Sequence, residues 1–260
     1  MKTLVPMLSA LVLCLSSSLA FAKDYDVIRF GVDPTYAPFA SKAADGALVG
    51  FEIDIGNALC AHLKVKCKWV ESDFDAMIPS LNSGKIDAIL ASMAVTPARE
   101  KVIDFSSEVF SSPTSLLFKK GAALDENLDM AKGKSVGYLQ GSIQEVYATR
   151  VLTRAGLKAV AYPDQDQVYA DLISGRLIAS IQDSLQARMG FMRTAQGAEF
   201  EMGKPIESDL LPSKSAIGIA KGNEALKALI DQGLAALHAD GTYERLQTKY
   251  FGDINLFSGK

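Results

Sequence analysis

Two kinds of hydrophobic pattern alternate along most of the chain. Continuous apolar runs predict buried strands at 27–32, 68–70, 86–91, 135–140, 160–162, 178–182 and 216–220. Apolar residues at helical spacing, such as Phe51, Ile55 and Leu59, predict helices. The predicted helices cover 51–63, 74–81, 142–152, 167–173, 225–237 and 243–250. Strands that alternate with helices are typical of an α/β fold with mostly parallel sheets and right-handed crossovers.

The pattern begins again partway along the chain. The segment LNSGKIDA at 81–88 is similar to LISGRLIA at 172–179, 91 residues later. In each segment a helix ends on Ser-Gly, a basic residue follows and a buried strand begins. Two such units predict two α/β lobes with a cleft between them. The last strand and two helices are too short for a third unit and are expected to complete one of these lobes.

The first 22 residues have the composition of a secretory signal peptide. Lys2 precedes an apolar stretch at 4–15, and Ala20-Phe21-Ala22 is an A-x-A cleavage site. A membrane anchor is the alternative, but these twelve residues are too few to span a bilayer core of ~30 Å. We therefore expect cleavage before Lys23 and export from the cytoplasm.

The expected export determines the oxidation state expected for the cysteines. Cys14 leaves with the signal peptide, so Cys60 and Cys67 remain as a pair in an oxidising compartment, where such a pair predicts a disulfide. The bond would join the end of one helix to the start of the next strand and contribute roughly 2–3 kcal/mol in the chain-entropy model. The pair lacks the C-x-x-C spacing of redox-active cysteines, so we expect a structural role.

Composition excludes several function classes. The 260-residue chain has a formal net charge of −3 and no long basic run, so nucleic acid is not an expected partner. Two His and three Cys are too few for a multi-ligand metal site. No glycine-rich loop of the kind that holds phosphates is present. We therefore expect neither a metal nor a cofactor.

Polar residues follow the predicted strands at the edge where open parallel sheets bind ligands. Asp33 follows the strand at 27–32, and Asp183 follows the strand at 178–182. Arg99 stands on the first turn of a predicted helix that begins at Thr96, and one Arg can bind a carboxylate through two parallel bonds.

A capping box, Ser142-x-x-Glu145, opens another predicted helix at the same edge, and the first N–H groups of a helix attract anions. The alternative is that both helix starts are plain caps and that Arg99 is a surface charge. Spacing alone leaves this alternative open.

Several motifs resemble one protein family. They are DPTYAPF at 33–39, GFEIDI at 50–55, KIDAI at 85–89 followed by Thr96 and Arg99, LQGS at 139–142 and QD at 182–183. From residue 23 nearly to its end, the chain is similar to the periplasmic solute-binding proteins (family 3) of bacterial ABC importers. The similarity is greatest to the branch of lysine/arginine/ornithine- and histidine-binding proteins, and the paired cysteines match that branch as well.

The resemblance implies a two-lobed periplasmic-binding-protein (Venus flytrap) fold with two hinge strands. Lobe 1 is expected to comprise 23–110 and 212–260, and lobe 2 to comprise 111–211. The chain would cross between the lobes near 111–113 and 211–213.

The resemblance also implies a role for twelve positions. Asp33 would meet a cationic side chain whose stem lies between Tyr36 and Phe74. Arg99 would clamp the carboxylate of the ligand, and Asp183 would receive its α-ammonium. The other positions would line the pocket or, at Ala94 and Ile143, offer backbone N–H groups; they are Ala91, Ser92, Ala94, Leu139, Ser142, Ile143 and Gln144.

Two carboxylates and one guanidinium call for a ligand with two positive groups and one negative group. Arg, Lys, ornithine and protonated His meet this condition, whereas Glu or Asp would leave a buried carboxylate unpaired. The family usually has Ser at the position of Ala94 and often Thr at that of Ile143. The lost hydroxyl at Ala94 makes room at the ammonium site, so an opine-like amino acid with a substituted α-nitrogen is an alternative ligand.

The implied function is transport. Ligand binding would close the lobes in the periplasm, and a membrane permease of the ABC type would recognise the closed form of a monomeric binding protein. Dehydratases and cell-wall lyases share this fold, so an enzyme is the alternative. We expect no catalysis, because Asp33 and Asp183 serve as counter-ions and neither His62 nor His238 belongs to a catalytic motif. A sensor domain that presents its ligand to a receptor stays open.

Overall fold

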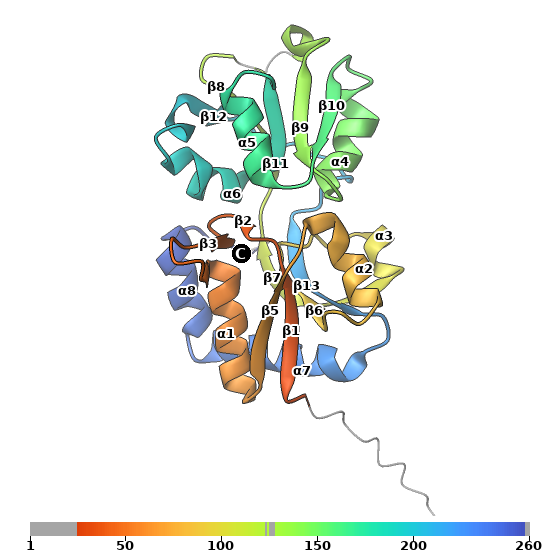
Figure 1. The fold of residues 1–260 in the computed structure, drawn as a ribbon, viewed down its shortest axis with the longest axis vertical. Helices are drawn as coiled ribbons and strands as arrows, with labels where there is room; N and C mark the ends of the chain where they lie inside the picture. The colour runs from red at the N-terminus through yellow and green to blue at the C-terminus, as the bar shows by residue number, and fades with distance from the viewer. Residues whose placement is uncertain (1–24, 123, 125–127, 258–260) are drawn as a thin grey trace, which may run out of the picture.

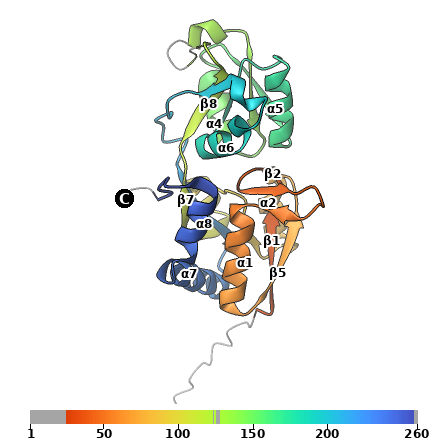
Figure 2. The ribbon, with the colours of Figure 1, turned by 90° about the vertical axis from the view of Figure 1, so that its left-hand side faces the viewer.

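The molecule consists of two lobes stacked one above the other, seen in two orientations in Figures 1 and 2. The computed structural model describes residues 25–122, 124 and 128–257. The predicted signal peptide lies outside these residues. Within them, each lobe is built on a five-stranded sheet, and no helix is long and apolar enough to cross a membrane.

The lower lobe of Figure 1 holds the sheet β5-β1-β6-β13-β7. Its strands are β1 (Val27–Val32), β5 (Lys66–Glu71), β6 (Ala88–Ile89), β7 (Ile103–Ser111) and β13 (Lys214–Ala220). Helices cover both faces: α1 (Phe51–Leu63), α7 (Glu224–Ala239) and α8 (Thr242–Phe251) on one, η1 (Phe74–Ala76), α2 (Met77–Asn82) and α3 (Pro97–Glu100) on the other. A small sheet that the hydrophobic pattern did not predict consists of β2 (Thr35–Tyr36), β3 (Ala40–Lys42) and β4 (Leu48–Val49).

The upper lobe holds the sheet β10-β9-β11-β8-β12. Its strands are β8 (Thr114–Lys119), β9 (Ser135–Leu139), β10 (Lys158–Tyr162), β11 (Ala179–Asp183) and β12 (Phe200–Met202). Its helices are η2 (Leu128–Ala131), α4 (Ile143–Tyr147), which continues as the π-helical segment η3 (Ala148–Leu152), α5 (Gln165–Ile173), α6 (Ser184–Met189), η4 (Phe191–Arg193) and η5 (Gly197–Glu199). The predicted α/β alternation is therefore confirmed in both lobes.

The two sheets share one topology. In each, three neighbouring strands are parallel, and the fourth, β13 or β8, is antiparallel to the strands on both of its sides. The sequence repeat falls at equivalent positions in the two lobes, between a helix and the strand that follows it. Helix α2 is followed by Gly84 with a φ of +71°, and helix α5 by Gly175 with a φ of +76°. Glycine adopts this left-handed conformation without the steric cost that a Cβ adds.

Apolar periodicity explains why these elements pack. Helix α1 buries Phe51, Ile55 and Leu59 in one core cluster with Leu226 and Ile230 of α7. In β8 the side chains alternate, so that Leu116 and Phe118 belong to one cluster and Leu117 to another. This alternation is the period of two expected for a strand with helices on both faces.

The predicted disulfide between Cys60 and Cys67 is present, and it joins the last turn of α1 to β5. The loop between the two elements is short, because the last helical residue is Leu63 and the strand begins at Lys66. The bond therefore ties a helix to the edge strand of the sheet on which that helix packs.

One strand is shorter than predicted. The run at 86–91 predicted a strand of six residues, but only Ala88 and Ile89 pair with β1. The backbone N of Leu90 still donates to Gly31 of β1, and the chain then turns at Ser92, whose φ is +52°. Beyond the turn, Ala94 forms an isolated antiparallel bridge with Ser215 of β13.

The chain passes between the lobes twice. Strand β7 leads through Ser112 and Pro113 into β8, and the return passes through Pro212 and Ser213 into β13. The two crossings lie side by side, because the backbone N–H of Ser112 donates to the carbonyl of Ser213 at 3.0 Å.

Candidate functional site

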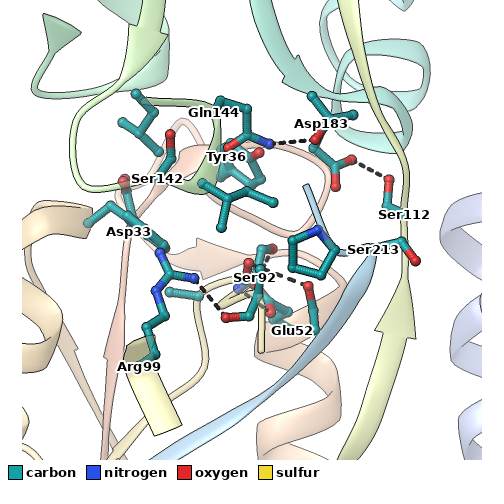
Figure 3. Close-up of a pocket in the computed structure, with 18 residues that line it drawn as sticks. Asp33, Tyr36, Glu52, Ser92, Arg99, Ser112, Ser142, Gln144, Asp183 and Ser213 are labelled. Carbon is teal, nitrogen blue, oxygen red and sulfur yellow. Dashed lines mark hydrogen bonds between the residues drawn. The ribbon is translucent and has the colours of Figure 1, made fainter. Parts of the chain in front are cut away.

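A pocket lies between the two lobes (Figure 3), with a volume of about 560 Å³ that includes space open to solvent. All twelve residues proposed from the sequence line it. The structure adds six residues that the sequence analysis did not propose: Glu52, Ser112, Thr114, Pro212, Ser213 and Ser215.

Asp33 follows β1 directly and carries an unsatisfied oxygen. Its Oδ1 accepts hydrogen bonds from the backbone N and the Oγ1 of Thr35, at 3.0 and 2.8 Å. Its Oδ2 is buried and, among the described residues, has no hydrogen-bond partner. Burial raises the pKa of Asp33 above its usual value. An unpaired buried carboxylate oxygen is costly, so a cation at this point would be stabilised strongly.

Two aromatic rings stand in the same part of the pocket. Tyr36 belongs to β2, and Phe74 begins η1. The guanidinium carbon of Arg99 lies 5.5 Å from the centre of the Phe74 ring, a distance at which a cation and an aromatic face attract. Phe74 therefore lines the pocket and also contacts the guanidinium of Arg99.

Arg99 is held rigidly on the short helix α3. The helix begins at Thr96, whose Oγ1 accepts from the backbone N of Arg99 at 3.2 Å. The guanidinium donates to the carbonyl of Ala94 at 2.8 Å and, across the cleft, to the carbonyl of Gly141 at 3.0 Å. Burial lowers the pKa of Arg99 to about 10, so the group stays cationic at neutral pH.

Asp183 ends β11 and caps α6. Its Oδ1 accepts from the backbone N of Gln186 at 2.8 Å and from the Oγ of Ser112 at 2.7 Å. Burial raises the pKa of Asp183 to about 6. Because Ser112 belongs to a crossing segment, the carboxylate is tied both to lobe 2 and to the connection between the lobes.

The predicted capping box at the start of α4 differs in one detail. Ser142 caps the helix as expected, since its Oγ accepts from the backbone N of Glu145 at 3.3 Å. The Glu145 carboxylate accepts from the backbone N of Gly141, at 2.7 Å, instead of that of Ser142. The reason is that the N–H of Ser142 already donates to the carbonyl of Leu139. Gln144, two residues after Ser142, donates to the Oγ1 of Thr114 at 3.0 Å.

Glu52 is the most important residue that the sequence analysis missed. Only 2% of it is exposed, and its two oxygens accept from the backbone N of Ser92 at 2.7 Å and from the Ser92 Oγ at 3.2 Å. These bonds hold Ser92 in a left-handed conformation that is unfavourable for a residue with a Cβ. In the sequence, Glu52 has the position of the exposed acidic residue that is common near a helix N-terminus. Its spacing from Ile55 and Leu59, however, places it on the buried face of α1.

The pocket therefore contains three carboxyl groups, Asp33, Glu52 and Asp183, and one guanidinium. Burial raises the pKa of Glu52 to about 7, and repulsion from Asp183 and Asp33 acts in the same direction. The described residues contain no group of three or more His, Cys, Asp or Glu side chains arranged to hold a metal ion. The excess of acidic groups favours a cationic ligand.

The raised pKa values predict a pH dependence for the ligand-free protein. A carboxyl whose pKa is higher in the folded than in the unfolded state binds extra protons when folded, so stability falls as pH rises through that window. For Glu52, between its ordinary value of 4.5 and about 7, we expect a loss on the order of 3 kcal/mol. Denaturant unfolding at pH 5 and pH 8 measures the effect, and Glu52→Gln should remove much of it. A wild-type stability that rises over this range would contradict the prediction.

Comparison with known proteins places the chain among binding proteins. Residues 28–253 match the family model of bacterial extracellular solute-binding proteins, family 3. The chain is 41% identical to the lysine/arginine/ornithine-binding periplasmic protein of Escherichia coli, over 99% of both sequences. It is 38% identical to the histidine-binding periplasmic protein of the same organism, over the full length of both.

Solved structures agree with the sequence relatives. An ancestral arginine-binding protein bound to arginine superposes with a TM-score of 0.81 at 33% identity, covering 87% of this chain and 99% of the other. An ancestral amino-acid-binding protein described as a precursor of cyclohexadienyl dehydratase superposes with a TM-score of 0.77 at 29% identity, covering 87% and 96%. The same fold thus occurs in binding proteins and in an ancestor of an enzyme.

Proposed function

Because the chain belongs to family 3 of the bacterial extracellular solute-binding proteins, as its motifs predicted, we propose that it captures a cationic amino acid by lobe closure and delivers it to an ABC-type permease. The candidates are Arg, Lys, ornithine and His. The observation that carries the proposal is the buried Oδ2 of Asp33, which has no hydrogen-bond partner among the described residues, in a pocket that also contains Arg99. The names of the relatives support the same ligand class.

In the proposed complex each charged group of the ligand meets a group of the pocket. The ligand carboxylate binds Arg99, and the α-ammonium binds Asp183. The cationic side chain lies between Tyr36 and Phe74 and ends at Asp33. Backbone N–H groups at Ala94 and Ile143 assist the carboxylate, and the remaining wall residues exclude water.

A ligand screen tests the proposal. The protein expressed without residues 1–22 is mixed with Arg, Lys, ornithine, His, Gln and Glu, and its thermal unfolding is recorded, followed by calorimetric titration. A ligand at 100 times its Kd stabilises the folded state by about 2.7 kcal/mol. We expect stabilisation by cationic amino acids and none by Glu. Stabilisation by Glu alone would refute the proposal.

A second ligand class is favoured by the wall of the pocket near Asp183. Ala94 offers no hydroxyl, while Ser213 brings one from a crossing segment. The hydroxyls of Ser112 and Ser215 also line the pocket but donate to Asp183 and to the carbonyl of Ser92. Space and hydrogen-bonding groups beside the ammonium site suit an opine-like amino acid with a substituted α-nitrogen. Titration with N-substituted Arg decides the matter, because tighter binding of free Arg would eliminate this alternative.

Lobe closure has a steric requirement at Gly141. Its φ is +76°, and a Cβ there would lie 2.8 Å from the Cα of Asp75 in the other lobe. The neighbouring Gln140 donates to the Asp75 carboxylate at 2.7 Å, so the lobes touch directly at this point. We expect Gly141→Ala to weaken ligand binding about 10-fold or more, because the clash exists only in the closed form.

The matched control is Gly175→Ala. Gly175 has the same φ of +76° and no atom within 4 Å of its ideal Cβ position, so the substitution carries the backbone strain alone. Calorimetry compares the affinities, and X-ray scattering compares the compaction that saturating Arg produces. Equal affinities for the two variants would contradict the predicted clash.

The remaining features of the proposal follow from the family. We place the mature protein in the periplasm as a monomer, without a nucleic-acid partner, with lobe 1 at 23–110 and 212–260 and lobe 2 at 111–211. The crossings at 111–113 and 211–213 act as hinges. Binding, not catalysis, is the proposed activity: Glu52 has a pKa suited to acid–base chemistry, but both of its oxygens are engaged by Ser92.

A further inference from the structure

Beside the pocket, lobe 2 contains a buried chain of hydrogen-bonded polar side chains. We call Gln165, Tyr169, Gln182 and Gln186 the glutamine network; none of the four is more than 7% exposed. Gln165 donates to the Oε1 of Gln182 at 2.9 Å, and Gln182 donates to the hydroxyl of Tyr169 at 2.7 Å. The Tyr169 hydroxyl donates in turn to the Oε1 of Gln186. Such a network is stable in a core only when its members satisfy one another.

Both ends of the glutamine network reach lobe 1, one on each side of Tyr36. The backbone N of Gln165 donates to the Oγ1 of Thr35 at 3.3 Å. The side-chain amide of Gln186 donates to the carbonyl of Ala37 at 3.0 Å. The segment that carries the aromatic pocket wall is therefore hydrogen-bonded to the opposite lobe directly before and directly after Tyr36.

The network determines the direction in which the Gln186 amide donates. Its Oε1 accepts from Tyr169 and, at 3.2 Å, from Gln182, so its NH₂ group points toward Ala37. The approach of the two lobes is close here, because a Cβ on Gly190 would lie 2.2 Å from the Ala37 carbonyl oxygen. The backbone N of Gln186 also donates to Asp183. Gln186 therefore lies next to the proposed ammonium site, although its side chain does not line the pocket.

We propose that Gln186 is a positioning residue, which binds the Tyr36 segment to lobe 2 in the closed form and thereby sets the affinity for every ligand without contacting any. The inference rests on the proposed capture of a ligand by lobe closure. The cross-lobe bond is made only when the lobes meet, so it stabilises the closed form relative to the open one. Its loss should speed ligand dissociation and leave association unchanged, because the ligand enters the open form.

The test is Gln186→Met, which keeps the length of the side chain and removes its amide. Binding of L-arginine, L-lysine and L-histidine is measured by calorimetry and stopped-flow kinetics. We expect every Kd to rise by the same factor, roughly 2- to 12-fold for one hydrogen bond, through faster dissociation. The backbone N of Gln186, and with it the cap on α6, is unchanged by this substitution.

Tyr169→Phe is the matched control. It removes a hydroxyl of the same network inside lobe 2. The Oε1 of Gln186 still accepts from Gln182 at 3.2 Å, so the NH₂ group continues to point toward the carbonyl of Ala37. We expect it to lower the thermal stability of the ligand-free protein and to leave the three Kd values within a factor of two. A purely structural role of the network would make the two variants lose affinity equally, and this result would overturn the inference.

Two further results would overturn it. Unchanged Kd values in Gln186→Met would show that the bond to Ala37 does not stabilise the closed form. A changed order of preference among the three amino acids would show that Gln186 contacts the ligand. If the wild-type protein binds none of the three amino acids, the proposed function fails and this inference fails with it. The wild-type titration alone distinguishes this outcome from the two above.

Discussion

Replacement of Arg99 by Ala is expected to weaken the binding of every amino-acid ligand severely. The pocket would keep three carboxyl groups, Asp33, Glu52 and Asp183, and lose the cation that lines it. A ligand carboxylate would then be desolvated without a partner. It would also face three acidic groups, which are only partly ionised at neutral pH because burial raises the pKa of Asp183 to about 6 and that of Glu52 to about 7. Loss of one partner of a buried, hydrogen-bonded charge pair costs about 2–5 kcal/mol, so we expect Kd to rise about 30- to 4,000-fold.

The matched variant is Arg99→Lys, which keeps the charge but lacks the planar fork that donates to Ala94 and Gly141 at once. We expect intermediate affinity from this variant. Calorimetric titration with Arg, Lys and His, with circular dichroism to establish folding, compares the two. Near wild-type binding by Arg99→Ala would show that the ligand carboxylate is held elsewhere in the pocket.

Asp33→Asn should affect binding and stability in opposite directions. The side chain keeps the oxygen that accepts from Thr35 and loses the negative charge on the unpartnered Oδ2. Affinity for Arg and Lys should fall about 10²-fold, because the cationic side chain loses its counter-ion. The ligand-free protein should become more stable by about 1 kcal/mol at pH 7.5, because an unpaired buried charge is removed.

The direction of the stability change follows from the pKa of Asp33. Burial raises this pKa, so the charged form destabilises the fold as pH rises above the ordinary value of 3.8. Asp73→Asn is the control, since Asp73 is exposed, repels Asp33 electrostatically and does not line the pocket. Calorimetry and denaturant unfolding measure both quantities. A variant that is less stable and still prefers Arg to Gln would contradict the assigned role.

Both predictions concern residues that the sequence analysis had placed. Asp33 directly follows β1 and Asp183 is the last residue of β11, and the position of a residue at a strand end is determined by local periodicity. Arg99 follows a Thr-Pro helix start that is itself a local signal. The family motifs assigned chemistry to these positions, and the structure brings all twelve of them to one pocket.

Glu52 and the pocket-lining role of the crossing segments were missed for a different reason. A carboxyl in the first turn of a helix is usually exposed and stabilises the helix dipole. The only local signal against this common case is the spacing of Glu52 from Ile55 and Leu59, which places it on the buried face. Its burial depends on Ser92, 40 residues away, and on the early end of β6. Ser112 and Ser213 line the pocket because the chain crosses between the lobes there, which periodicity does not encode.

The sequence by itself determined the α/β class, the two repeated units, the Cys60–Cys67 bond and the strand ends that carry Asp33 and Asp183. These features depend on the spacing of side chains along one element or across one short loop, which any sequence displays directly. Only the tertiary structure decided which groups meet across the cleft, such as Arg99 with Gly141 and Gln186 with Ala37. The physical reason is that burial and pairing of these groups depend on how two separately folded sheets approach each other, and that approach is set by contacts between residues as much as 149 positions apart.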